Sequence, residues 1–124
     1  VNTIPKATFK RVIFFLNCSP RNMSEAKNFY LFGSPIQHSL SPLLHNTGFQ
    51  HYNLPYKYAL FDTTDINSVE ECLKRSDTAG GSVTIPHKQA VMKFITHLSD
   101  SAKAIGAVNT ITKVSYGPVY ISAK

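Results

Sequence analysis

The sequence lacks the glycine-rich loops with which proteins hold nucleotides. Neither a GxGxxG nor a Walker-type loop occurs in its 124 residues, and such loops are what bring backbone amides close to phosphates. Cysteine is scarce as well: Cys18 and Cys72 are the only two, and neither belongs to a CxxC pair. The cysteines therefore predict no metal site, and reduced thiols in a cytoplasmic protein are the expectation.

Long apolar runs are also missing. No run approaches the ~18 residues of a membrane span, so we expect no membrane partner. Residues 10–16 resemble the start of a secretory signal, but their apolar run is shorter than the roughly 7–15 residues that such signals use.

Acidic residues are few, with seven against thirteen lysines and arginines, which gives a net charge of +6. Such a balance fits an anionic partner or simply a lysine-rich surface. The basic residues form no continuous run, and we therefore expect no nucleic-acid partner.

Length and composition predict one folded domain. A chain of 124 residues that is 43% hydrophobic and 16% charged matches a globular domain rather than a disordered one. We expect this domain at residues 28–114, after a leader of unknown role at 1–27 and before a tail at 115–124. Residues 12–16 of the leader are either an added strand or an exposed adhesive segment.

From Asn28 the pattern alternates between strands and helices. Strands are expected at 29–33, 56–61, 82–85 and 108–114, and helices at 42–53, 66–73, 91–98 and 99–104. Ser41 suits the N-cap of the first helix, with Pro42 at its first position. This order predicts an α/β fold, a three-layer sandwich with a mainly parallel sheet flanked by helices. Ligands of such sheets bind beyond the carboxyl ends of the strands.

Two hydroxyl groups stand at the start of the first predicted helix. Ser39 and Ser41 end the segment at residues 33–41 that follows the first strand. Free backbone N–H groups and the helix dipole favour an anion there, and both hydroxyls could donate to one carboxylate. Plain helix capping is the alternative, since Ser-x-Ser-Pro is common at helix starts.

Two further clusters follow later strands. Thr84 ends a predicted strand after Gly80-Gly81, and Lys88 lies near the next helix start. The helix dipole disfavours a cation there, so Lys88 is a candidate general acid or base; the alternative is a solvated surface lysine. Asn109 offers a donor and an acceptor for a hydroxyl group, or is a turn residue. Most of the five histidines are expected at the surface or in caps.

Taken in order, these clusters resemble the N-terminal, substrate-binding domain of the shikimate dehydrogenase family. That family includes quinate dehydrogenases and the related regions of fungal aromatic-pathway proteins and quinate repressors. The resemblance covers about residues 30–110. It implies that Ser39 and Ser41 bind the carboxylate of shikimate, that Thr84 and Asn109 bind ring hydroxyls, and that Lys88 is the catalytic lysine. The implied ligands are shikimate, 3-dehydroshikimate or quinate, with NADP as the cofactor of the complete enzyme.

The sequence also departs from that family. The family pairs its lysine with an aspartate in a later Asn-Thr-Asp-Gly-like stretch, whereas no acidic residue follows Asp100 here. The nucleotide-binding domain is expected to be absent, so this chain should bind no NADP itself. An enzyme fragment that is inactive alone and a non-catalytic shikimate- or quinate-binding regulatory module both remain open.

Overall fold

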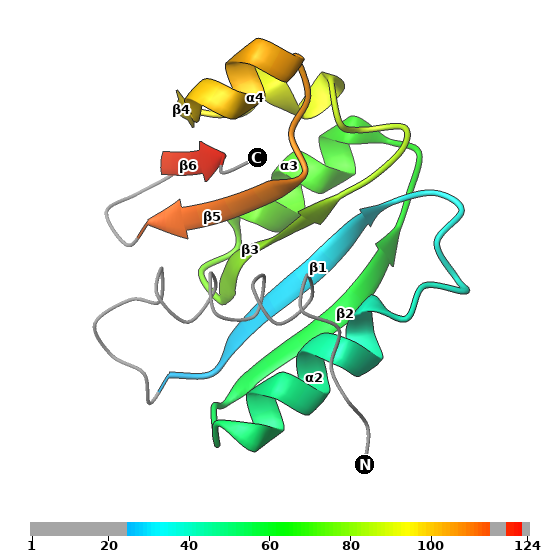
Figure 1. Ribbon diagram of the computed structural model, residues 1–124, viewed down its shortest axis with the longest axis vertical. Helices are drawn as coiled ribbons and strands as arrows, with labels where there is room; N and C mark the ends of the chain where they lie inside the picture. Colours follow the sequence, from blue (N-terminus) through cyan, green and yellow to red (C-terminus); the bar gives the residue numbers. More distant parts are fainter. Residues whose placement is uncertain (1–24, 115–118, 123–124) are drawn as a thin grey trace.

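The strands of the described residues form one six-stranded sheet with the order β2-β1-β3-β5-β6-β4. The computed structural model describes residues 25–114 and 119–122 (Figure 1). β1 is parallel to both β2 and β3, whereas β5 is antiparallel to its neighbours β3 and β6. The strands are β1 (Lys27–Gly33), β2 (Tyr56–Asp62), β3 (Thr78–Val83), β4 (His97–Leu98), β5 (Thr110–Val114) and β6 (Val119–Ser122).

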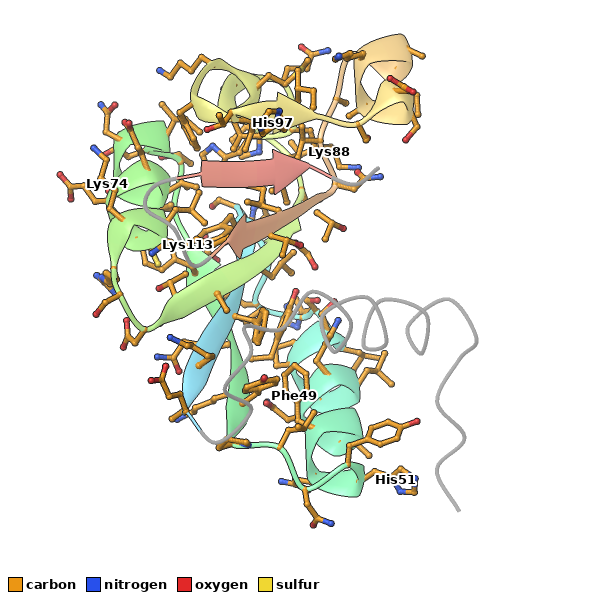
Figure 2. The ribbon with its side chains drawn as sticks, turned by 90° about the vertical axis from the view of Figure 1, so that its left-hand side faces the viewer. Phe49, His51, Lys74, Lys88, His97 and Lys113 are labelled. Atoms are coloured by element: carbon orange, nitrogen blue, oxygen red, sulfur yellow. The ribbon has the colours of Figure 1, made fainter. Side chains whose placement is uncertain are left out.

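Helices cover both faces of this sheet. They are α2 (Ser41–His51), α3 (Ile66–Lys74), the 3₁₀ helix η1 (Ala90–Phe94) and α4 (Asp100–Ile105). Figure 2 shows α2 on one side of the sheet and α3 on the other. The predicted α/β sandwich with a mainly parallel sheet is confirmed.

The alternation of side chains along β1 explains the two layers of core. Phe29 and Leu31 belong to one apolar cluster together with Phe49 of α2. Phe32 belongs to the other, which contains Val69 of α3. Successive strand residues point to opposite faces, so a strand that is apolar on both faces must lie inside the sheet, as β1 does.

β3 owes its position to two adjacent glycines. A Cβ added at Gly81 would collide with the Tyr30 carbonyl oxygen of β1, and one added at Gly80 would collide with the Ile111 carbonyl oxygen of β5. Close approach of backbones is thus the role of this pair. β3 consequently begins before the predicted strand at 82–85 and ends at Val83.

Three local predictions were wrong. The helix expected at 91–98 is only the five-residue η1 followed by β4; its apolar spacing reflects packing of Val91, Phe94 and Leu98 on the core rather than an α-helix. Ser41 is the first residue of α2 and not its N-cap, which is Leu40. The last strand begins at Thr110 and not at residue 108.

Other expectations meet the structure only in part. Residues 12–16 lie outside the described residues, whereas β6 adds residues 119–122 of the expected tail to the sheet. Cys72 is buried and free of a disulfide. Among residues 25–114 and 119–122, no helix has the length and apolarity to span a bilayer, and no group of three metal-binding side chains occurs.

Candidate functional site

A pocket of about 610 Å³ lies beyond the carboxyl ends of β1 and β3. Its walls come from β1, the loop after it, the first turn of α2, the end of β3 with the following turn, and the segment before β5. Its lining includes all five predicted site residues, Ser39, Ser41, Thr84, Lys88 and Asn109. Residues far apart in sequence thus meet at the sheet edge where the parallel topology predicts a ligand site.

The two serines lie where the chain enters α2. The Ser41 N–H group donates to the Ser39 hydroxyl oxygen over 3.2 Å. The Ser41 carbonyl oxygen accepts from Nδ1 of His45 over 2.8 Å, and His45 is buried and stacked on Tyr58 at 4.1 Å between ring centroids. The stack and these bonds hold both serines at the pocket, where each residue is half-buried.

The opposite wall is a backbone network around the end of β3. The Thr84 N–H group donates to the Phe32 carbonyl oxygen over 2.9 Å, and the Val83 N–H group donates to the Asn109 carbonyl oxygen over 2.7 Å. The Lys88 carbonyl oxygen accepts from the Val108 N–H group over 2.8 Å. These bonds hold the backbones of the three pocket-lining residues Thr84, Lys88 and Asn109 around the end of β3, and Lys88 lies where β5 begins (Figure 2).

Some pocket residues were not predicted. Gln37 and His38 line the pocket from the loop between β1 and α2, and both are exposed. Ser82 also lines the pocket, but it is only 2% exposed and its hydroxyl group has no hydrogen-bond partner. Ser82 stood inside a predicted strand, where a serine gives no signal of a site. The alternation of side chains along a strand could have indicated Ser82, because it lies two residues from Thr84 and so on the same face of the predicted strand.

The histidines divide between surface and interior. His38, His51 and His97 are exposed, as expected for most of them. His45 and His87 are the two described histidines that are buried, each with 1% of its surface exposed. Both rings bond to backbone carbonyl oxygens, and that bond is what allows a polar ring to be buried.

Asp62, at the end of β2, shapes the pocket from outside it. A hydrogen bond from the Ser34 side chain is the main reason why the pKa of this carboxyl lies below its ordinary value, followed by one from the Ile36 N–H group. The distance from the Ile36 nitrogen to Oδ2 of Asp62 is 3.3 Å. The carboxylate thereby holds the loop that supplies the pocket residues Pro35, Ile36 and Gln37.

We predict that this loop loosens in acid. Because the folded pKa of Asp62 is depressed, the stability that it contributes is fully present above the ordinary pKa of about 3.9 and is lost as the pH falls through the lower folded value. NMR titration of the Asp62 carboxyl carbon should give a midpoint below that of an unfolded aspartate. Asp62→Asn should flatten the acid limb of stability against pH, and an unchanged limb in this variant would contradict the assignment.

The part of the chain that the structure describes does not fit a dinucleotide cofactor. Gly80 and Gly81 lie inside β3, with the backbones of β5 and β1 against them, and so offer no cradle for a pyrophosphate. The pocket instead presents hydroxyl groups, a carboxamide and a lysine amine around Leu31, Ile36 and Val83. This combination suits a small ring that carries hydroxyl groups and an anionic group.

The chain matches the family model described as the shikimate dehydrogenase substrate binding domain over residues 31–111. The pentafunctional AROM polypeptide of Mycosarcoma maydis is 53% identical over 92 residues, which are 73% of this chain and 5% of that protein. The corresponding protein of Schizosaccharomyces pombe is 46% identical over 91 residues, 73% of this chain and 6% of that protein. The chain thus spans a small part of the curated relatives that it matches.

Solved structures agree with the family match. The dehydroquinate dehydratase and shikimate dehydrogenase of S. pombe AroM superimposes with a TM-score of 0.76 at 43% identity, covering 79% of this chain and 19% of that one. The shikimate 5-dehydrogenase of Listeria monocytogenes, solved with shikimate and NAD, gives 0.73 at 30% identity and covers 84% and 36%. A 5-ketofructose reductase at 22% identity shares the fold.

Proposed function

Because the chain belongs to the shikimate dehydrogenase substrate-binding domain family, we propose that its pocket binds shikimate or the oxidised form, 3-dehydroshikimate. Quinate, which carries the same carboxylate and a similar set of hydroxyl groups, is the closest competitor. The observation that carries the proposal is the convergence of five residues from separate segments on one pocket. Relatives whose structures were solved with shikimate support the choice of ligand.

Each end of the ligand has a matching wall. The carboxylate would lie against Ser39 and Ser41, whose hydroxyl groups can both donate to it. Thr84 and Asn109 would bind ring hydroxyls from the opposite wall, since each offers a donor and an acceptor. The amine of Lys88 would approach the ring oxygen at which the proton is exchanged.

The proposed role of these 124 residues is substrate binding without turnover. In the related enzymes the reaction uses a nicotinamide cofactor, and one relative was solved with NADP⁺. The described residues offer no cradle for a pyrophosphate, because Gly80 and Gly81 lie inside β3 against the neighbouring backbones. We therefore propose that this chain is the substrate half of an oxidoreductase and that a separate cofactor domain is needed for the reaction.

A non-catalytic sensor is the second candidate function. The observation that favours it is that the proposed binding residues Ser39, Ser41, Thr84 and Asn109 all line one pocket, which is enough to hold a ligand without any reaction. Both hypotheses predict shikimate binding. Only the substrate-half hypothesis predicts that adding a cofactor domain produces turnover, and that this turnover depends on Lys88.

Binding to the isolated chain should be weak, with a dissociation constant roughly in the millimolar range, about −4 kcal/mol. The pocket is open to water on one side, and hydration weakens its hydrogen bonds. Ser41→Ala should raise the constant about fivefold or more, because a bond to a charged acceptor is lost. NMR titration measures both constants.

Two controls make this test specific. Ser76→Ala removes an exposed serine hydroxyl that does not line the pocket and should leave the constant unchanged. The methyl ester of shikimate lacks the carboxylate charge but keeps a carbonyl oxygen that accepts a weaker hydrogen bond, so the difference in binding between the parent and Ser41→Ala should shrink. An undiminished difference with the ester would remove the serine from the carboxylate subsite.

A further inference from the structure

His87 is buried beside a pocket that it does not line. Its side chain is 1% exposed, and Nε2 lies 2.6 Å from the Thr63 carbonyl oxygen, 24 residues away in sequence. A carbonyl oxygen only accepts hydrogen bonds, so Nε2 carries the proton and donates it to this bond. The imidazole thus joins the turn after β3 to the end of β2.

The end of β2 is bonded to both walls of the pocket. The Thr63 N–H group donates to the Gly33 carbonyl oxygen over 3.1 Å, and the Asp62 carboxylate accepts from the Ile36 N–H group over 3.3 Å. These bonds fix the loop before α2. The bond from His87 to the Thr63 carbonyl oxygen fixes the turn after β3 against Thr63, the residue that follows β2.

Lys88 follows His87 directly and lines the pocket. The backbone N–H group of His87 donates to the Thr84 carbonyl oxygen over 3.0 Å, and the Lys88 carbonyl oxygen accepts from Val108 over 2.8 Å. In this turn the His87 ring is therefore buried in the protein, whereas the next residue, Lys88, lines the pocket. A displacement of the ring that its own side-chain torsions do not absorb would pass to the adjacent Lys88 backbone.

We propose that His87 is a positioning residue: its bond to the Thr63 carbonyl oxygen sets the place of Lys88 in the pocket. This role deepens the proposed function and rests on it for the identity of the ligand, though not for the geometry of Lys88. A side chain that merely filled the interior would need no hydrogen bond, and leucine would serve as well. If His87 only fills space, a leucine should replace it without effect. If its hydrogen bond positions Lys88, the leucine should change the position of Lys88.

Three variants separate these two roles. His87→Gln retains an amide that reaches as far as Nε2, whereas His87→Asn carries the same amide on a chain that is one methylene shorter. His87→Leu fills the space without a donor. Variants are compared well below their unfolding temperatures, and the Asn variant decides the result if the Leu variant does not fold.

The first measurement needs no ligand. Trace acetylation of the full chain with acetic anhydride, followed by peptide mass spectrometry, gives the labelling rate of Lys88 relative to Lys93 and Lys103. Loss of one hydrogen bond corresponds to roughly a threefold to tenfold change. We expect a Lys88 rate at least about threefold faster in the Asn and Leu variants and one within about twofold of the parent in the Gln variant. Equal Lys88 rates in parent and Leu variant, or equal changes at all three lysines, would overturn the proposal.

The second measurement is a double-mutant cycle on shikimate binding. His87→Asn should weaken binding about fivefold in the parent but have no further effect in a Lys88→Met background, because the histidine acts through the lysine. Additive losses would overturn the positioning role and assign His87 to general stability. If the parent does not bind shikimate, the proposed ligand is wrong, and the labelling result alone still decides the role of His87.

Discussion

Replacing Gly80 with alanine is expected to lower the free energy of unfolding by about 3 kcal/mol or more. An added Cβ would collide with the Ile111 carbonyl oxygen of β5 and lie 3.2 Å from Cα of Thr112. The backbone at Gly80 also has φ at +151°, which side chains rarely adopt. β3 cannot move away from β5 within the sheet without being pressed against β1, because it lies between these two strands and pairs with both. Urea denaturation followed by circular dichroism measures the loss.

Gly106 provides the matched control for this substitution. It also has a positive φ, +75°, but an added Cβ would meet no atom within 4 Å. Gly106→Ala should therefore show only the cost of a left-handed conformation, about 1–2 kcal/mol. Equal losses at the two glycines would mean that close approach of β3 to β5 is not what requires Gly80.

The second large effect concerns turnover. The isolated chain should show no NADP-dependent oxidation of shikimate, and adding a cofactor domain from a related enzyme should produce it. Lys88→Met should then lower the rate constant about 10²–10⁴-fold, the usual contribution of general acid–base catalysis. NADPH absorbance measures the rate, and calorimetry should detect no micromolar binding of NADP to the isolated chain.

Lys93→Met is the control for this loss, since Lys93 is exposed on η1 and does not line the pocket. Full activity in Lys88→Met would show that the lysine has no part in proton transfer. Robust activity of the 124 residues alone would contradict the substrate-half proposal. Binding with no turnover in any combination would instead favour the sensor.

The convergence of the candidate site could be predicted from sequence because of one topological rule. Carboxyl ends of parallel strands meet at one edge, and the clusters around Ser41 and Lys88 each follow a strand of this kind. β5 is antiparallel, so Asn109 reaches that edge from the start of its strand rather than from the end. The expectation that the Asn109 cluster follows a strand was therefore wrong, since Asn109 precedes β5, and it was the donor and acceptor of its amide that made it a candidate.

Other features depend on contacts that no local pattern encodes. The 91–98 segment has helical spacing, but its apolar residues pack on the core from a short 3₁₀ turn and a strand. The hydrogen bond between His87 and Thr63 joins residues 24 positions apart, and no periodic pattern in the sequence indicates such a contact. A glycine pair such as Gly80-Gly81 permits either a turn or a close approach of backbones, and only the neighbouring strands distinguish the two.

Mapping the shikimate-binding surface by NMR tests the central claim most directly. In a titration of the ¹⁵N-labelled chain, we expect the largest amide shifts at Ser39, Ser41, Thr84, Lys88 and Asn109, all with one common dissociation constant. Amides of α3 and α4, which do not line the pocket, should stay in place. An absence of shifts at high shikimate concentration, or shifts centred on α3 or α4, would contradict the assignment of this pocket as the substrate site.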